Sequence, residues 1–325
     1  MGSPLVLRDK IYGQVSLRLP VLVELIKSAP VQRLKNISQF GVPDKYYFLK
    51  GFSRYEHSIG VMFLLNKLGA CREEQIAGLL HDVSHTAFSH VIDFVVGSEK
   101  FEDFQDSQHE RIIKNSEIPK ILHKYGYNYK KIADYHNFPL LEQDIPNICA
   151  DRIDYALREF PLNTARKCYK NLEIFNNKIV FADKNSAILF ARKFVEISLN
   201  HWGNKEAVIR YRLLSGILKI ALSKKIISQN DLWKDEEQVL HKLENSQDAK
   251  ITLSFKILKN KKLPNFRLSN NFSEKKFRFV DPLFIENQTL KQLSKDDLKF
   301  KTWLWKIKKG NEAKKIPVPR LTDFL

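Results

Sequence analysis

The sequence predicts a mainly α-helical protein with a smaller mixed α/β part at its C-terminal end. Residues 1–165 divide mostly into segments of helical length separated by short polar turns. Residues 250–285 instead alternate polar and apolar side chains, a pattern typical of strands. The 325 residues, 43% of them hydrophobic, suffice to bury a sizeable core. We therefore expect a helical first part over 1–165 and a helical and mixed α/β, basic second part over 166–325 packed on it.

The first part is expected to contain several helices joined by short connections. The first of them is apolar on most of its faces, which indicates that it is buried. The second should end directly before His81 and Asp82, and the last carries Asp151 and Asp154 at helical spacing. These helices are predicted over residues 57–68, 73–80, 88–96 and 144–160.

A hairpin signature opens the second part. Residues 173–182 contain two short β-prone runs, with Asn176 and Asn177 between them as the turn. The remaining predictions are helices over 186–199 and 207–222, followed by strands around ITLSFKIL (251–258) and KFRFVDPLF (276–284).

The charge and the cysteine content indicate which partners and which cellular compartment to expect. The formal net charge is +17, and residues 250–325 hold 19 Lys or Arg against 7 Asp or Glu, a net +12. This basic region could bind nucleic acid, or it could be an ordinary solvated surface. The three cysteines form no CxxC pair, which argues against disulfides and zinc fingers and favours a reducing, cytoplasmic setting. No apolar run approaches the roughly 18–20 residues of a membrane helix, so no membrane partner is expected.

Two histidines and two aspartates are candidate metal ligands. His57 lies in a predicted buried helix, His81 and Asp82 stand at a helix end, and Asp151 lies in a later helix. A carboxylate in apolar surroundings needs a cationic or hydrogen-bonding partner. Imidazole nitrogens combined with carboxylate oxygens suit a divalent ion such as Mn, Mg, Fe, Ni or Zn. An isolated His-Asp pair is common by chance, so the evidence for a metal site must come from the segments around these residues.

Four such segments occur in order: SRYEHSIGV (53–61), IAGLLHDVSHTAFSHVID (76–93), HE (109–110) and ADRIDYALRE (150–159). Together they resemble the deoxynucleoside triphosphate (dNTP) triphosphohydrolase branch of the HD superfamily, which includes the SAM-and-HD-domain proteins and microbial relatives. The resemblance covers roughly residues 10–165 and implies an HD-domain helical bundle. It begins about ten residues after Met1, from which we expect no SAM domain.

The resemblance assigns roles residue by residue. It implies that His57, His81, Asp82 and Asp151 hold the metal. The catalytic set that it implies consists of Arg54 and the histidines that line the phosphate pocket or lie near the scissile bond: His85, His90 and His109. For the substrate, it implies phosphate contacts from Arg54, Arg152 and Tyr155, a deoxyribose contact from Gln39, and a place near the 3′-hydroxyl for Glu159.

The chemistry of phosphate ester hydrolysis needs these residue types. A metal lowers the pKa of its bound water and neutralises phosphate charge. Arg54 and Arg152 can each donate to two phosphate oxygens as charge develops. A histidine such as His109 can protonate the leaving oxygen. Asp154 is expected to orient a histidine or an arginine and not to bind the metal itself.

Three functions remain open at this point. The leading hypothesis is a metal-dependent dNTP triphosphohydrolase that releases a deoxynucleoside and inorganic triphosphate. The second keeps the metal site but acts on a phosphodiester, a nucleoside monophosphate or another phosphorylated metabolite. The third is a nucleic-acid-binding protein with a regulatory HD site, suggested by Phe300, Trp303 and Trp305 among the C-terminal lysines. The resemblance also implies a homo-oligomer.

Overall fold

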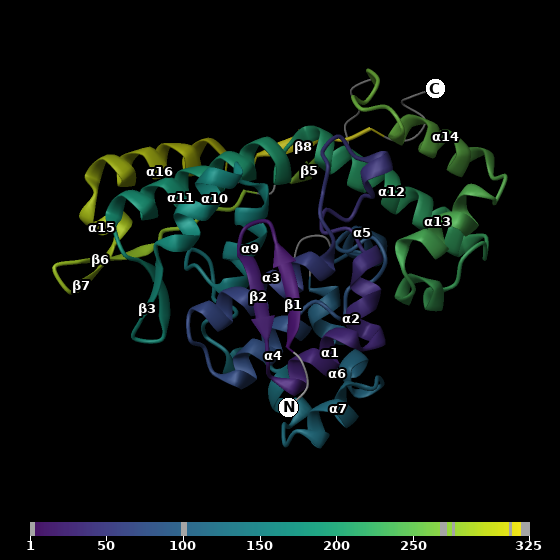
Figure 1. Cartoon of the computed structure of the whole chain (residues 1–325). Coiled ribbons are helices and arrows are strands. Elements are labelled where there is room, and N and C mark those ends of the chain that lie inside the picture. The colour runs from purple at the N-terminus through teal and green to yellow at the C-terminus, as the bar shows by residue number, and fades with distance from the viewer. Residues whose placement is uncertain (1–3, 99–102, 267–271, 275–276, 312–313, 320–325) are drawn as a thin grey trace.

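The structure, a computed structural model, describes residues 4–98, 103–266, 272–274, 277–311 and 314–319. It confirms the predicted class, a mainly α-helical protein with a smaller mixed α/β part at its C-terminal end (Figure 1). The helices of the first part are α1 (Pro20–Lys27), α2 (Ala29–Arg33), α3 (Arg54–Lys67), α4 (Arg72–Leu80), α5 (Val91–Val96), α6 (Phe104–Lys114), α7 (Ile118–Lys124), α8 (Tyr129–Ala133) and α9 (Ala150–Glu159). Those of the second part are α10 (Leu162–Lys170), α11 (Lys184–Ile197), α12 (Lys205–Ser223), α13 (Glu236–Glu244), α14 (Ala249–Leu258), α15 (Leu293–Asp296) and α16 (Leu298–Asn311).

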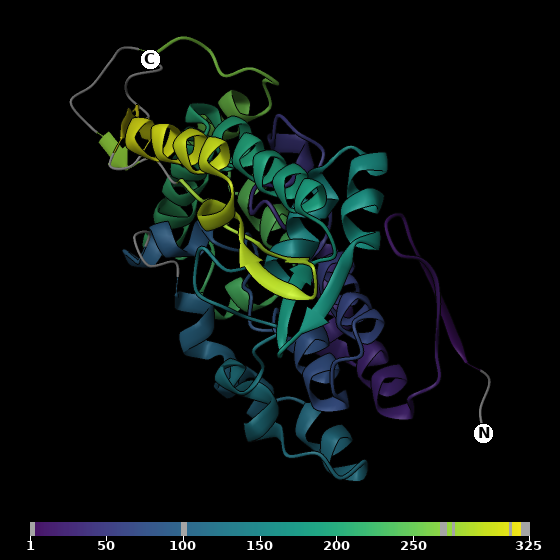
Figure 2. The ribbon, with the colours of Figure 1, turned by 90° about the vertical axis from the view of Figure 1, so that its left-hand side faces the viewer.

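Within the described ranges, the strands form three small sheets. β1 (Leu5–Asp9) and β2 (Gly13–Leu17) make an antiparallel hairpin at the N-terminal end. A second antiparallel pair joins β5 (Phe272–Glu274) to β8 (Lys315–Pro317). The largest sheet has the order β3-β4-β6-β7, in which β4 and β6 run parallel and the other neighbours antiparallel. Its strands are β3 (Leu172–Phe175), β4 (Lys178–Phe181), β6 (Leu283–Glu286) and β7 (Thr289–Gln292), and Figure 2 shows β6 and β7 beside the β3–β4 hairpin.

The helix that carries the first predicted ligand has a well-defined start. Ser53 caps α3: its hydroxyl accepts from the backbone N–H of Glu56, and the Glu56 carboxylate accepts from the Ser53 backbone in return. Almost every side chain from His57 to Leu65 is buried, because α3 packs on both α4 and α9. The helical bundle and the second part share one hydrophobic cluster, which includes residues of α3, α4, α11 and β6. The boundary near residue 165 stays a prediction.

Several predicted elements agree with the structure. The hairpin over 173–182 is confirmed as β3 and β4, and Asn176 and Asn177 both have positive φ angles (48° and 56°), as a type I′ turn requires. Helices were also predicted correctly at α3, α4, α11 and α12.

Other predictions were wrong in extent or kind. The segment 251–258 is not a strand but part of α14, because Asp248 accepts from two backbone N–H groups at the helix start and Ile251, Phe255 and Leu258 are buried at helical spacing. The helix expected over 144–160 begins only at Ala150, as α9.

Two more differences concern the first part and the second sheet. The helix expected over 88–96 begins only at Val91, because Phe88 and Ser89 have positive φ angles (67° and 45°). Of the strand expected over 276–284, the described residues 277–282 are not in a strand, and Lys276 lies outside the described residues. The β1–β2 hairpin was not predicted; Gly13, with φ of 78°, follows its turn.

Candidate metal centre

Three helices bring the predicted metal ligands together. His57 lies in α3, His81 and Asp82 directly follow α4, and Asp151 is in the first turn of α9. The Nε2 atom of His57 is 2.8 Å from Asp151 Oδ1 and 3.2 Å from His81 Nε2. The Nε2 atom of His81 is 3.5 Å from Asp151 Oδ1 and also 3.5 Å from Asp82 Oδ1. The four side chains therefore lie together: the ligand atoms of His57, His81 and Asp151 are within 4.8 Å of one another, and the Asp82 carboxylate lies beside them.

This donor set fits a divalent cation. Ligand atoms that lie about 2.1 Å from a shared ion are about 3 Å apart, which matches the separations among His57, His81 and Asp151. The Asp82 carboxylate lies nearby, 3.9 Å from His57 Nε2, while both of its oxygens accept from Arg54 Nη1. His57 is fully buried, whereas the Asp151 side chain is 22% exposed, so the cluster opens to solvent on the Asp151 side. Two nitrogens and carboxylate oxygens suit the same ions that the sequence suggests.

Electrostatics also favour a cation at this point. Burial would raise the pKa of Asp82, but the Arg54 and His81 charges hold it well below its usual range. Asp151 is likewise kept well below its usual pKa, against the effect of burial, by hydrogen bonds from His57 and His81. Burial would lower the pKa of His81, yet the neighbouring Asp82 and Asp151 raise it to about 9. Without a metal, protons on the imidazoles balance the carboxylates, and an ion that binds these nitrogens must displace those protons.

Both imidazoles are held from behind. The Nδ1 atom of His81 is 2.8 Å from the carbonyl oxygen of Gly78, and that of His57 is 2.8 Å from Asp154 Oδ2. These contacts leave both Nε2 atoms directed at the cluster, the arrangement in which histidines commonly bind metals. Asp154 also accepts from Arg158 Nε at 2.7 Å. Asp154 therefore contacts both a histidine and an arginine, and its orienting role stays a prediction.

The predicted phosphate residues lie beside the cluster. Arg54 is buried, and besides Asp82 it donates from Nε to the Ser89 hydroxyl at 2.9 Å. His85 Nε2 is 3.2 Å from Asp82 Oδ1, and the His85 ring lies edge-on to the ring of His90. His90 is bonded through Nδ1 to Asp93 and its side chain is 28% exposed. Arg54 and His85 therefore adjoin the metal centre, and His90 lies at its solvent side.

His109 has one unsatisfied nitrogen. Its Nδ1 atom lies 2.9 Å from the Ser84 hydroxyl, whereas its Nε2 atom is buried with no hydrogen-bond partner among the residues that the structure describes. Burial and the nearby His81 charge lower the pKa of His109 to about 3, so the imidazole is neutral at pH 7. A buried polar atom without a partner is costly, which leaves a substrate oxygen as a natural partner for Nε2.

Two of the predicted substrate residues, Arg152 and Glu159, contact residues other than the predicted metal ligands. Arg152 donates to the carbonyl oxygens of Gln143 and Asn147 and pairs with Glu142. The carboxylate of Glu159 accepts from Trp202 Nε1 at 2.8 Å and lies 2.5 Å from His201 Nδ1. Their roles in substrate binding stay predictions.

Tyr155 and Gln39 contact residues of the metal centre or of the predicted phosphate site. The Tyr155 ring is 6.3 Å from that of His57, and burial raises the pKa of its phenol. The side-chain oxygen of Gln39 is buried without a partner in the described part of the chain. The Arg54 guanidinium lies 3.5 Å from the Gln39 carbonyl oxygen, so Gln39 adjoins the phosphate residues.

Comparison with known proteins identifies the family. The HD domain family matches residues 54–159, the stretch that contains all four converging residues. Uncharacterized protein YdhJ from Bacillus subtilis is 40% identical over 293 residues, covering 87% of this chain and 90% of that protein. The metal-dependent phosphohydrolase cns2 from Cordyceps militaris is 32% identical over 243 residues, covering 71% of this chain and 70% of that one. The chain belongs to the HD-domain family of metal-dependent phosphohydrolases.

Membership in this family makes the protein a hydrolase that uses a divalent metal ion. A more distant relative is the human deoxynucleoside triphosphate triphosphohydrolase SAMHD1, 34% identical over 145 residues, which cover 37% of this chain and 23% of SAMHD1. A hypothetical protein from Aquifex aeolicus has the same fold, with a TM-score of 0.64 at 22% identity over 92% of this chain and 93% of that one. Among the described residues, no helix has the length and hydrophobicity needed to span a membrane.

The sequence did not indicate several residues that support the HD site. Ser89 accepts from Arg54 and donates to the carbonyl oxygen of Ser38 at 2.7 Å. Glu236, in α13 of the second part, accepts from the backbone N–H groups of Ser38 and Phe88 and from the Ser38 hydroxyl. Because it lies 198 residues from Ser38, no local pattern could have indicated it. Glu236 thus joins two segments that frame the Arg54 side chain.

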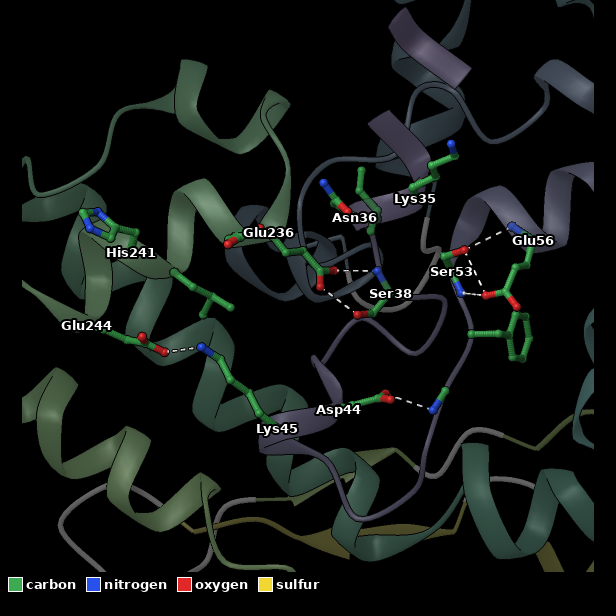
Figure 3. A pocket seen from close by; sticks show the side chains of 15 residues that line it. Lys35, Asn36, Ser38, Asp44, Lys45, Ser53, Glu56, Glu236, His241 and Glu244 are labelled. Atoms are coloured by element: carbon green, nitrogen blue, oxygen red, sulfur yellow. Dashed lines mark hydrogen bonds and ion pairs between the residues drawn. The ribbon is translucent and has the colours of Figure 1, made fainter. Parts of the chain in front are cut away.

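Glu236 also lines a pocket of about 630 Å³ between α13 and the segment 35–56 (Figure 3). Figure 3 shows its carboxylate pointing at Ser38, while Lys45 pairs with Glu244 across the same pocket. None of the four converging residues of the metal centre lines it. Within the described structure, this pocket is therefore separate from the candidate catalytic site.

The protonation of Glu236 should make the stability of the fold depend on pH. Burial raises its pKa from 4.5 to about 7 despite the donors from Ser38 and Phe88. Because the folded pKa lies above the unfolded one, the stabilisation is complete below pH 4.5 and is lost as the pH rises through 7, a loss of roughly 3 kcal/mol. In Glu236→Gln this loss should be absent, since an amide offers Oε1 to both backbone donors and Nε2 to the Ser38 hydroxyl.

Urea unfolding of wild type and Glu236→Gln between pH 4.5 and 8.5 measures this difference. Glu237→Gln, at the exposed neighbouring position, is the matched control and should follow the wild-type profile. If Glu236→Gln and wild type lose stability in parallel over this range, Glu236 does not titrate with a raised pKa.

Proposed function

We propose that the protein is a dNTP triphosphohydrolase, which cleaves a deoxynucleoside triphosphate into a deoxynucleoside and inorganic triphosphate. The observation that carries the proposal is the convergence of His57, His81, Asp82 and Asp151 beside Arg54 and the unpartnered Nε2 atom of His109. The motifs that resemble the triphosphohydrolase branch and the 34% identity to human SAMHD1 over 145 residues support this substrate class over other phosphate esters.

The proposed reaction is the hydrolysis of the bond between the α-phosphorus and the 5′-oxygen. Water adds its oxygen to the α-phosphorus and gives up one proton, the bond between that phosphorus and the 5′-oxygen breaks, and the 5′-oxygen takes up one proton, so that the two products together contain the atoms of the substrate and of one water molecule. The metal, when bound, supplies Lewis acid chemistry that neutralises phosphate charge and makes water more acidic.

The residues around the metal complete this site. Arg54 neutralises phosphate charge on the buried side. His109 offers its free Nε2 atom to the leaving oxygen. Gln39, Arg152, Tyr155 and Glu159 are the candidates for contacts with the rest of the nucleotide.

Turnover with chromatographic product analysis tests the substrate. Purified protein with Mn²⁺, Mg²⁺, Fe²⁺ or Ni²⁺ should release triphosphate and deoxynucleoside in equal amounts from at least one dNTP. Orthophosphate or a monophosphate as the product, or cleavage of only a phosphodiester, would retain the HD site and contradict the proposed substrate. That second outcome would support the phosphatase or phosphodiesterase alternative.

His109→Ala should lower kcat by about 10²–10³-fold, the usual effect of removing one neutral hydrogen-bond donor from the charge that develops in the transition state. KM should change much less, since the imidazole contacts the leaving oxygen and not the base. Steady-state kinetics with the best dNTP measures both constants. His123→Ala, a histidine outside the site on α7, is the control and should keep the wild-type kcat. A His109→Ala enzyme with nearly wild-type kcat would remove His109 from the reaction.

Nucleic-acid binding is a second candidate, favoured by the surface of α16. Trp305 is 58% exposed, Lys309 lies over its ring at 5.1 Å, and the helix holds further lysines. Exposed aromatic rings among lysines can stack on bases of single strands. Salt-sensitive binding of a labelled single-stranded DNA that is lost in Trp305→Ala would support nucleic-acid binding.

The predicted homo-oligomer is a separate prediction, which light scattering on the purified protein tests.

A further inference from the structure

The turn of the N-terminal hairpin reaches the back of the candidate metal centre. In Figure 1, β1 and β2 run beside the helical bundle. Asp9 is the last residue of β1, and Tyr12 lies in the turn between the strands. The Tyr12 phenol donates to Asp154 Oδ1 at 2.5 Å, and Asp9 Oδ2 accepts from Arg158 Nη2 at 2.9 Å. Two hairpin residues therefore contact the Asp154–Arg158 pair, more than 140 residues later in the chain.

The Asp154 carboxylate has its hydrogen bonds divided between its two oxygens. Oδ2 takes His57 Nδ1 and Arg158 Nε, while Oδ1 takes the Tyr12 hydroxyl. Asp154 is fully buried, so water cannot replace a missing donor. The phenol is thus the described donor that fixes the second oxygen and, with it, the rotation of the carboxylate.

Tyr12 is itself held in one position. Asp9 Oδ1 accepts from the backbone N–H groups of Ile11 and Tyr12, which shapes the turn. The Tyr12 ring packs edge-on against Tyr169 and Phe63 and is only 8% exposed. Burial and the neighbouring Asp154 raise the pKa of its phenol, which keeps the hydroxyl protonated and able to donate.

We propose that Tyr12 is a positioning residue of the metal centre: its hydroxyl fixes the Asp154 carboxylate, which in turn fixes the His57 imidazole toward the ion. The inference rests on the proposed role of His57 as a metal ligand. Partners behind metal-bound histidines typically change metal affinity or activity by about 10–100-fold. The hairpin is then a part of the catalytic machinery and does more than cover the core.

Metal affinity tests this inference apart from turnover. Chelator-treated protein is titrated with Mn²⁺, and free Mn²⁺ is followed by electron paramagnetic resonance, with isothermal titration of Ni²⁺ as a second probe. Tyr12→Phe removes one hydroxyl and keeps the packed ring. Because Tyr12 acts through Asp154, the variant should bind Mn²⁺ about 10-fold more weakly than wild type, the lower end of that range, at a temperature well below unfolding. Tyr46→Phe is the matched control, because its phenol also donates to a carboxylate, that of Glu244, on the pocket side of the molecule. It should bind Mn²⁺ like wild type.

His57→Ala in the same titration tests the metal assignment separately from the role of Tyr12. If His57→Ala loses Mn²⁺ binding while Tyr12→Phe binds like wild type, the positioning role is wrong and the metal assignment stands. If His57→Ala also binds like wild type, the assignment of the metal to this cluster fails and the inference fails with it. A weakened Tyr12→Phe together with a non-binding His57→Ala supports both. In that case kcat of Tyr12→Phe at saturating Mn²⁺ should recover toward the wild-type value.

Discussion

Replacing His57 by alanine should abolish turnover while leaving a folded protein. The imidazole is fully buried, and its Nε2 atom lies within 3.2 Å of both His81 Nε2 and Asp151 Oδ1. A bound metal supplies several kcal/mol of transition-state stabilisation, so kcat should fall by roughly 10³-fold or more. Loss of Mn²⁺ binding in an equilibrium titration should accompany the loss of turnover.

Folding must be separated from catalysis in this experiment. Removing the imidazole also takes a partner from Asp154, so thermal unfolding should be measured together with far-ultraviolet circular dichroism. Asp151→Asn is a second variant, because its partly exposed side chain can change without leaving a cavity. His136→Ala, at an exposed position, is the matched control and should equal wild type. A folded His57→Ala protein with wild-type turnover would show that the metal lies elsewhere.

The sequence was most informative where the determinants are local. The apolar residues of α3 and the Asn176-Asn177 turn predict a helix and a hairpin that the structure contains, since both depend on periodicity and turn chemistry within a few residues. For 251–258 the same reasoning failed. In so short a run the apolar residues fit both the two-residue period of a strand and the 3.6-residue period of a helix, and the helix start at Asp248 decides between them.

For the candidate site, the motifs predicted which residues converge but not what holds them. His57, His81, Asp82 and Asp151 stand in short segments that resemble a known family, and the comparisons confirm the family. Their roles as ligands stay predictions. Tyr12 and Glu236 contact the site only through tertiary packing, at sequence separations of 142 and 198 residues from their partners. Periodicity carries no information about such contacts, whereas Arg158, four residues after Asp154 on α9, could have been noticed as a helical ion pair.

A methyl group added at Gly60 should destabilise the protein strongly, although glycine is normally unfavourable inside a helix. Gly60 lies in α3, one turn after His57, and faces the Asp154–Arg158 pair. A Cβ atom there would lie 2.1 Å from Asp154 Oδ1 and 2.1 Å from Arg158 Nη2. Contacts so short cannot be kept, so the carboxylate or the guanidinium must leave its place. Disrupting a buried, hydrogen-bonded ion pair typically costs about 3–5 kcal/mol.

Gly216→Ala in α12 is the matched control, and it is expected to change stability in the opposite direction. Gly216 is also a helix-interior glycine, but a Cβ atom there meets nothing within 4 Å. Its replacement should stabilise the protein by up to about 1 kcal/mol, the difference in helix propensity between glycine and alanine. Urea unfolding of both variants should therefore shift in opposite directions, and Gly60→Ala should also bind Mn²⁺ more weakly because Asp154 can no longer orient His57. Equal stability of the two variants would mean that the space beside Gly60 adapts to the methyl group, and that the Asp154–Arg158 pair is not held as tightly as its contacts indicate. Opposite shifts with weaker Mn²⁺ binding would tie the packing of α3 on α9 directly to the metal centre.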